Sequence, residues 1–305
     1  MNIIDSNKEI INIIKLNKPF IIARFGLGPE TTVCYNYYKN KKLNNNNFNN
    51  LLRICGIYYK NKKLNNNNFN NLLRICGIYS KNNDIKIFEK YFQELNNSIK
   101  NANLLACFYN SKIESIQNEY SQVFNLTKIH SRTLEPFYVI QDNEIPWTHF
   151  LFGKKVLVIN PFTDSMQKQL NNNFQIFKDK KIFLDGQEFI FYKTFQTHGD
   201  NYIHNDWLET FTIMCNDIEK LEFDIALLGC GGYGLPLCNF IKTKMNKSSI
   251  YIGGGLQLLF GVMGHRWINR EDWKKIIKEN NTNFIYPSVN EQLNNKNTIE
   301  NSAYW

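Results

Sequence analysis

A glycine-rich run, GCGGYG from Gly229 to Gly234, constrains the fold of this chain more than any other feature. It directly follows the apolar segment 223–228 and precedes a stretch with helical spacing over 235–245. A G-x-G-x-x-G pattern between a strand and a helix lets a phosphate approach backbone N–H groups at the start of the helix. A structural turn that needs several residues with positive φ is the alternative interpretation. The run predicts a buried strand, a tight turn that binds phosphate, and a helix.

Strand and helix patterns alternate along the rest of the chain. Buried strands are indicated by the apolar runs at 19–26, 103–109, 154–162 and 248–255. A first helix is indicated from Ser6, where Glu9 completes a capping box, and a later helix over 206–220. Strands that are apolar on both faces and alternate with helices form a parallel sheet covered on each side. We therefore predict an α/β, Rossmann-like fold with a mainly parallel sheet and helices on both faces.

A segment of 21 residues occurs twice in succession, at 38–58 and 59–79, without a single difference. Identity at every position indicates a duplication of the coding sequence. Two copies are too few for a solenoid, and the asparagine tracts favour turns. We predict one α/β domain over 1–305 with the duplicated segment as a surface insertion and a sub-lobe boundary near 126–150. An oligomerisation or acceptor-binding arm is the alternative role of the duplicated segment.

The composition limits the compartment and the partners. The chain carries a formal net charge of +9, seven cysteines without a CxxC pair, and no run of 18 apolar residues. Its first residues show no basic stretch followed by an apolar segment, as a signal peptide would. These observations predict a cytoplasmic protein with no membrane span. The charge suits nucleic acids, acidic lipids, nucleotides and phosphorylated glycans alike, and does not choose among them.

Binding residues are expected where the predicted strands end, because the carboxyl ends of parallel strands form the ligand crevice in such sheets. The first strand ends near Arg24, and Gly26, Gly28 and Glu30 follow it. An arginine at a strand end suits a bidentate contact with phosphate, and a nearby carboxylate can act as a base. A structural loop with a surface ion pair is the alternative interpretation.

The last predicted strand ends in three glycines, Gly253–Gly255, and this ending argues against a dinucleotide site. Such a site has an acidic residue about 20 positions after the glycine motif, which binds a ribose hydroxyl. No acidic residue lies at this strand end, which weighs against NAD and against S-adenosylmethionine. With the run at Gly229, the three glycines predict a floor of backbone donors for a diphosphate or a flat sugar ring. Asn160 and Pro161, at the end of the middle strand, could contribute a side-chain contact.

A histidine-rich segment between two predicted strands supplies candidate bases. His198 and Asp206 lie there with His204 between them. A histidine near carboxylates can serve as a general base at neutral pH. Metal ligation by these three residues would lack a recognised ligand spacing.

Two further groups of polar residues are candidates for ligand contacts. Gln257 and Arg266 closely follow the last glycine cluster, and their side chains could form hydrogen bonds with a ligand. Arg132 and Glu135 lie in an aromatic stretch broken by prolines, which suits either an acceptor groove or a domain connector.

Several of these motifs together resemble one enzyme family. ARFG after the first strand, KKVLVINPF in the middle, and IALLGCGGYGLPLCNFI with IYIGGG further on are similar to motifs of the GT-D-type glycosyltransferases, in order and roughly in spacing. The resemblance implies a Rossmann-like enzyme of polysaccharide assembly that uses nucleotide-diphosphate sugars. That family follows RFG with an acidic D-G-E element tied to metal and donor. Here Leu27-Gly28-Pro29-Glu30 stands in its place, so Glu30 is the remaining carboxylate and dependence on Mn²⁺ or Mg²⁺ stays open.

We therefore predict a glycosyltransferase that moves a sugar from a nucleotide-diphosphate donor, with a UDP-sugar favoured, to a hydroxyl of a glycan or polysaccharide. Glu30, His198 or Asp206 would take the acceptor proton, and Arg132 and Glu135 would contact the acceptor. The donor would be bound by Arg24, Phe25, Gly26, Gly28, Asn160, Pro161, Gly229, Gly231, Gly232, Tyr233, Gly234, Gly253, Gly254, Gly255, Gln257 and Arg266. No metal ligand is assigned.

Two alternatives rest on other features of the sequence. The G-x-G-x-x-G run suits a nucleotide-cofactor enzyme, either an S-adenosylmethionine methyltransferase or an NAD oxidoreductase. The net charge of +9 and the reduced acidic motif suit a non-catalytic glycan- or nucleic-acid-binding protein, with nucleic acid the less favoured ligand. The sequence indicates neither the sugar nor the oligomeric state.

Overall fold

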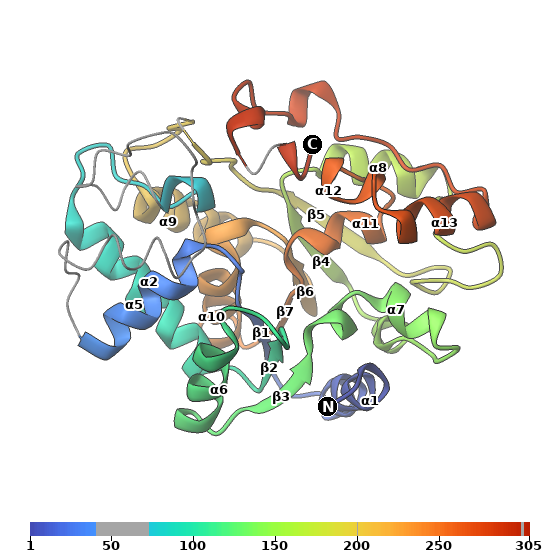
Figure 1. Ribbon diagram of the computed structural model, residues 1–305, viewed down its shortest axis with the longest axis horizontal. Coiled ribbons are helices and arrows are strands. Elements are labelled where there is room, and N and C mark those ends of the chain that lie inside the picture. The colour runs from blue at the N-terminus through green and yellow to red at the C-terminus, as the bar shows by residue number, and fades with distance from the viewer. Residues whose placement is uncertain (41–72, 200, 300–301) are drawn as a thin grey trace.

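A parallel sheet of seven strands forms the centre of the molecule (Figure 1). The computed structural model describes residues 1–40, 73–199, 201–299 and 302–305. In spatial order the strands are β3 (Thr127–His130), β2 (Leu104–Cys107), β1 (Ile21–Arg24), β7 (Ser248–Tyr251), β6 (Ile225–Leu228), β4 (Val156–Asn160) and β5 (Phe189–Lys193). Every pair of neighbours is parallel. The predicted α/β, Rossmann-like fold is confirmed.

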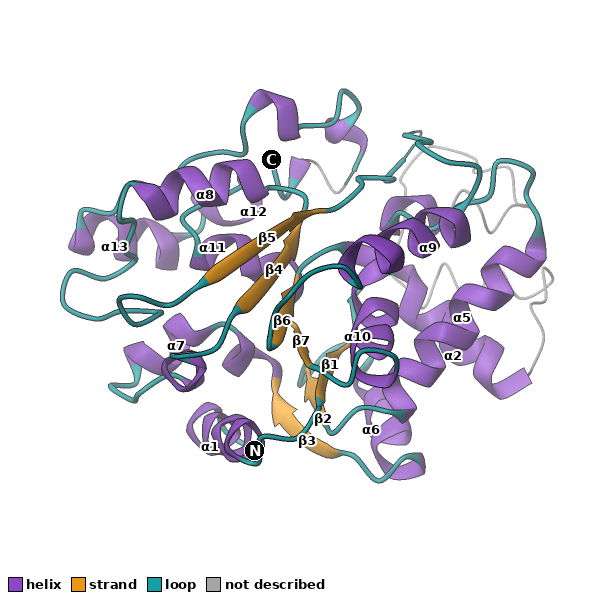
Figure 2. Ribbon diagram, turned by 180° about the vertical axis from the view of Figure 1, so that it is seen from behind, coloured by secondary structure: helices purple, strands orange, loops and turns teal. Residues whose placement is uncertain are grey.

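Helices cover both faces of the sheet, as Figure 2 shows. One face carries α2 (Pro29–Asn40), α5 (Ile85–Lys100), α6 (Glu114–Val123), α9 (Trp207–Ile218) and α10 (Gly234–Thr243). The other carries α1 (Ile3–Lys15), α7 (Pro136–Gln141), α8 (Thr163–Asn171), α11 (Leu256–Leu259), α12 (His265–Ile268) and α13 (Glu271–Asn280). Short 3-10 helices lie at η2 (Arg74–Cys76), η3 (Ser131–Leu134), η4 (Trp147–Leu151), η5 (Gly231–Tyr233), η6 (Gly253–Gly255), η7 (Val289–Glu291) and η8 (Lys296–Thr298).

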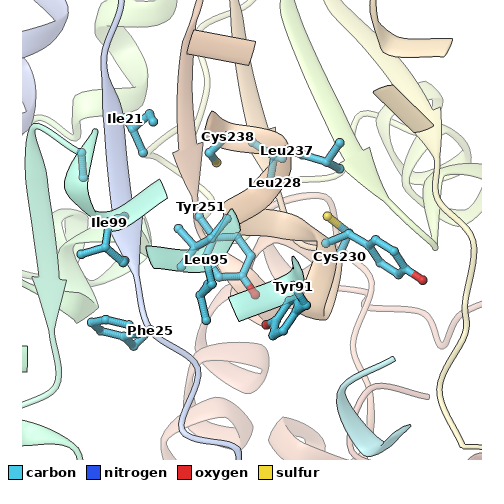
Figure 3. Packing of buried hydrophobic residues seen from close by; sticks show 14 of the residues in the cluster. Ile21, Phe25, Tyr91, Leu95, Ile99, Leu228, Cys230, Leu237, Cys238 and Tyr251 are labelled. Carbon is cyan, nitrogen blue, oxygen red and sulfur yellow. The ribbon is translucent and has the colours of Figure 1, made fainter. Parts of the chain in front are cut away.

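Two hydrophobic clusters, one on each face of the sheet, form the core. Successive residues of a strand point to opposite faces, so Leu157 of β4 packs in one cluster and Val158 in the other. Figure 3 shows the cluster under α5 and α10, where Leu95 of α5 and Leu237 of α10 lie with Tyr251 of β7. Because both faces are buried, the strands are apolar throughout instead of alternating.

The first helix begins earlier than the capping box at Ser6 predicts. Helix α1 starts at Ile3, and its N-cap is Asn2, whose side-chain oxygen accepts a hydrogen bond from Asp5 N at 2.8 Å. Ser6 Oγ instead donates to Asn2 O at 2.6 Å and accepts from His130 N at 2.8 Å. The Ser6 side chain therefore ties α1 to the end of β3 and does not cap the helix.

The connections after β1 and β7 leave the sheet on opposite sides. Strand β1 leads into α2 on one face, whereas the neighbouring β7 leads through η6 into α11 on the other. A reversal of this kind between adjacent parallel strands opens a crevice at their carboxyl ends, where open α/β sheets bind ligands. The topology thus brings Arg24, which ends β1, next to the glycines that follow β7.

The end of the duplicated segment belongs to the core. Leu73, Ile78 and Tyr79 are fully buried at 0% exposure, and the first two belong to the cluster under α5. The prediction of a surface insertion is therefore wrong for residues 73–79, whose apolar side chains are needed to fill that cluster. The stretch 41–72 of the two copies lies outside the described residues, so the prediction is untested there.

Removal of one repeat copy is expected to preserve the fold. Deletion of 38–58 or of 59–79 gives the same protein, which keeps one RICGIY sequence for the buried positions of 74–79. The sequence between residues 40 and 73 falls from 32 to 11 residues, and we expect the free energy of unfolding to differ by no more than about 1 kcal/mol. Urea unfolding of both proteins measures this difference. A deletion variant that fails to fold would show that the connection needs its full length.

Candidate functional site

Arg24 lies over a glycine at the crevice between β1 and β7. Gly253 follows β7 with a φ of +73°, and a Cβ built on it would lie 2.0 Å from Arg24 Nη2 and 2.8 Å from Cζ. Any residue other than glycine would therefore displace the guanidinium group. The glycine that was predicted to bind phosphate itself makes room for the arginine that was predicted beside it.

The guanidinium group of Arg24 contacts aromatic rings instead of a carboxylate. Its Cζ lies 5.2 Å from the ring centroid of Phe108 and 5.9 Å from that of Tyr251. Its Nε is buried and has no hydrogen-bond partner in the part of the chain that the structure describes. Burial raises the pKa of Tyr251 well above its usual value, and the charge of Arg24 opposes this shift. Arg24 is thus a cation at the crevice with hydrogen-bonding capacity for an anion.

Glu30 folds back over the loop between β1 and α2. It lies in the first turn of α2, and a Cβ on Gly26 would lie 2.0 Å from its Oε1, while one on Gly28 would lie 2.3 Å from its Oε2. Cys76 Sγ donates a hydrogen bond to Glu30 Oε2 at 2.8 Å. The two glycines after β1 therefore make room for a carboxylate that a thiol from η2 holds in place.

His198 lies against the glycine turn that follows β6. Gly231 has a φ of +56°, and its Cβ would lie 3.1 Å from His198 Nε2. The Nδ1 atom is buried and finds no hydrogen-bond partner within the described residues. Burial lowers the pKa of His198 to about 4. The imidazole is therefore neutral at pH 7, and a base with so low a pKa accepts a proton weakly.

The pKa of His198 predicts a pH dependence of stability. His198 has a pKa of 6.5 in the unfolded chain and of about 4 in the folded protein. Its contribution to stability is therefore fully present above pH 6.5, and it is lost as the pH falls toward 4, because the unfolded chain then binds a proton that the folded protein does not. Compared with His198→Asn, the wild type should lose up to about 3 kcal/mol more unfolding free energy over this range. Urea unfolding at both pH values measures it, and equal losses in the two proteins would contradict the burial of this imidazole.

Protein atoms occupy the space where side chains would stand at five other glycines of the predicted floor. A Cβ on Gly232 would lie 2.7 Å from Ile78 Cγ1, and one on Gly234 would lie 2.1 Å from the Tyr251 ring. A Cβ on Gly229 would lie 2.6 Å from Gly253 O. One on Gly254 would lie 2.4 Å from the Tyr304 ring, and one on Gly255 would lie 2.6 Å from the Glu135 carboxylate. At these five glycines the missing side chains admit neighbouring protein groups, and the role of their backbone N–H groups as donors to a ligand stays a prediction.

Four residues predicted to bind the donor are buried. Phe25, at 1% exposure, packs against Tyr120 in the core. The amide of Asn160 donates to Gly229 O at 2.8 Å and accepts from Phe162 N at 2.9 Å. The other two buried residues are Tyr233, which hydrogen-bonds Thr197, and Gln257, which donates to Tyr304 O. These side chains are used by the protein itself, which corrects their predicted role. Pro161 begins the turn after β4.

The remaining predicted residues lie around the crevice or away from it. Arg132 Nη1 pairs with Glu135 Oε2 at 3.1 Å, beside Gly255. Arg266 Nη1 donates to the Tyr304 hydroxyl at 2.8 Å, and the Tyr304 ring covers Gly254. Asp206 is the N-cap of α9, where its side chain accepts from Glu209 N at 2.9 Å. Asp206 thus caps α9, and its assignment as a catalytic base stays a prediction.

Sequence reasoning missed two residues of the site. The Tyr251 hydroxyl donates to Gly231 O at 3.0 Å, so this ring joins the glycine turn to Arg24. The second missed residue is Cys76, which comes from the duplicated segment. The alternation of β7 toward the α5 face could have identified Tyr251. Nothing in the sequence distinguishes Cys76 from its identical counterpart Cys55.

Neither a similarity to known proteins nor a group of metal-ligating side chains identifies the function of the site further. No family model, curated protein or solved structure matches the chain. Within the described ranges, His, Cys, Asp and Glu side chains do not gather in any group of three or more that could hold a metal ion. None of the described helices is long and apolar enough to cross a membrane.

Proposed function

We propose that this chain transfers a sugar from a nucleotide-diphosphate donor, with a UDP-sugar favoured, to a hydroxyl of a glycan. The observation that carries the proposal is Arg24, a cation at the β1–β7 crevice that contacts aromatic rings and whose buried Nε has no acceptor among the described residues. A diphosphate carries negative charge, and two oxygens of one phosphate group can accept the two parallel N–H bonds of a guanidinium group. The resemblance of the motifs to those of the GT-D-type glycosyltransferases favours sugar transfer over other reactions of diphosphates.

The proposed reaction uses the positive charge of Arg24 and the negative charge of Glu30. The acceptor oxygen attacks the anomeric carbon, and the bond from that carbon to the diphosphate oxygen breaks. The diphosphate leaves with the electron pair, and Arg24 stabilises the charge that develops on it. Glu30 takes the proton of the acceptor hydroxyl. His198 stays neutral next to Gly231 and shapes the crevice floor.

Thermal denaturation with nucleotides tests the proposal. UDP and UDP-sugars at 100 times their Kd should raise the melting temperature by about 5 °C, whereas NAD and S-adenosylmethionine should leave it unchanged. Release of UDP from a UDP-sugar in the presence of glycan acceptors then tests transfer. A chain that responds to neither nucleotide diphosphates nor sugar nucleotides does not have this function.

A further inference from the structure

A surface cavity of about 390 Å³ lies at the edge of the sheet where the strands begin. Most of its lining residues directly precede β1, β4, β6 and β7, which are parallel, so the cavity lies at the amino ends of these strands. The crevice with Arg24 lies at their carboxyl ends. The cavity is thus separate from the proposed site of sugar transfer, and a role for it does not depend on that proposal.

Lysines give this cavity a positive charge. Its charged lining residues are Lys18, Lys154, Lys155, Lys247, Glu222 and Asp224. Four lysines and two carboxylates leave a formal charge of +2, and none of these lysines forms an ion pair within the described ranges. Asp224 instead accepts from a backbone group, Lys155 N, at 2.7 Å. The lysine charges are therefore available to an anion.

The ends of nearby helices account for only part of this charge. A helix C-terminus attracts cations, and Lys18 follows α1 while Lys247 follows α10. Lys154 and Lys155 instead lead directly into β4. The helix ends therefore leave the two lysines before β4 unexplained.

Two exposed apolar side chains adjoin the lysines. Leu16 is 64% exposed and Phe152 is 55% exposed. Asn17, next to Leu16, accepts a hydrogen bond through Oδ1 from Lys154 Nζ at 3.2 Å. Since Lys154 lies two residues after Phe152, this bond brings the two apolar residues to the same part of the surface. Large exposed apolar side chains beside lysines are typical of proteins that bind the interface of a lipid bilayer.

The four lysines with Leu16 and Phe152 form one surface, which we call the amino-edge surface. We propose that it binds the face of a membrane that contains anionic phospholipids. The ammonium groups contact the headgroup phosphates, and the two apolar side chains enter the layer between the headgroups and the acyl chains. Nucleic acids also carry phosphates but offer no apolar layer, so Leu16 and Phe152 favour the membrane.

Co-sedimentation with vesicles tests the role of the lysines. The protein should bind vesicles of phosphatidylcholine and phosphatidylglycerol in about equal amounts, and should bind pure phosphatidylcholine vesicles about tenfold more weakly. Lys18→Gln/Lys155→Gln should lower the binding to the mixed vesicles about tenfold or more. Neither Nζ atom forms a hydrogen bond or an ion pair within the described ranges, so the fold should be unaffected. Lys81→Gln/Lys86→Gln removes the same charge from exposed positions near the start of α5 and should bind as the wild type does.

Tryptophan fluorescence tests the contact of the apolar residues without a change in charge. All five tryptophans of the chain are buried, so an indole introduced at position 152 reports on that position. The emission of Phe152→Trp should shift to shorter wavelength when the mixed vesicles are added. Val289→Trp places an indole at a position that is 83% exposed in η7, outside the cavity lining, and its emission should stay unchanged.

The two experiments decide between a membrane and other anions. A loss of about tenfold in the lysine variant, together with the shift in Phe152→Trp, supports membrane binding. Wild-type binding by Lys18→Gln/Lys155→Gln, an equal loss in Lys81→Gln/Lys86→Gln, or an unchanged emission of Phe152→Trp overturns it. Binding of single-stranded RNA that is as tight as vesicle binding and is lost in the same lysine variant would assign the surface to nucleic acid instead. Release from the vesicles by inorganic phosphate at constant ionic strength would show a site for small anions and would likewise contradict the proposal.

Discussion

Replacement of Arg24 by glutamine is expected to weaken the binding of UDP by about 100-fold, measured by isothermal titration calorimetry. The guanidinium group can donate two charge-assisted hydrogen bonds to a diphosphate, and glutamine retains neither its charge nor its planar fork. Stability should change little. Arg24 has no ion pair to lose within the described residues, and its Nε is already without a partner there.

Two further variants make the result specific to this arginine. Arg24→Lys keeps the charge but loses the bidentate geometry, so its affinity should fall about tenfold, between those of the wild type and Arg24→Gln. Arg270→Gln removes an arginine that is paired with Asp272 near α13 and should bind UDP as the wild type does. Equal UDP affinity in Arg24→Gln and the wild type would remove the observation on which the proposed function rests.

The sheet was predictable because its signals are local. Apolar runs of strand length that alternate with helical spacing indicate a parallel sheet wherever they lie in a chain. The same alternation rule explains the wrong prediction for Phe25. Neighbouring residues of an extended chain point in opposite directions, so Arg24 at the crevice places Phe25 in the core against Tyr120. A site residue and its sequence neighbour therefore seldom share a ligand on a strand.

The roles of the glycines depended on tertiary contacts that no local pattern contains. The sequence shows where a side chain is missing, but not which group fills the space. In the fold, Gly253 admits Arg24, Gly231 admits His198, and Gly26 admits Glu30. The glycines thus lie where predicted but seat the polar side chains of the site. The buried end of the duplicated segment was unpredictable for a similar reason, since nothing in its sequence shows that residues 73–79 fill positions in the core.

Substitution of Gly253 by alanine is expected to weaken UDP binding about 100-fold while the protein stays folded. The new Cβ would lie 2.0 Å from Arg24 Nη2, and the guanidinium group, at the end of a flexible side chain, would move away to relieve the contact. The affinity for UDP should therefore fall about 100-fold, as in Arg24→Gln. The φ of +73° adds a backbone penalty of about 1–2 kcal/mol to the unfolding free energy.

Gly153→Ala separates the backbone penalty from the displacement of Arg24. Gly153 has a φ of +81°, and a Cβ there would meet no atom within 4 Å, so this variant should lose similar stability and keep full affinity for UDP. In the double variant Arg24→Gln/Gly253→Ala, the second substitution should weaken binding no further, because the group that it displaces is already absent. Additive losses of affinity would mean that Gly253 itself contacts the diphosphate, as its place in the sequence first indicated.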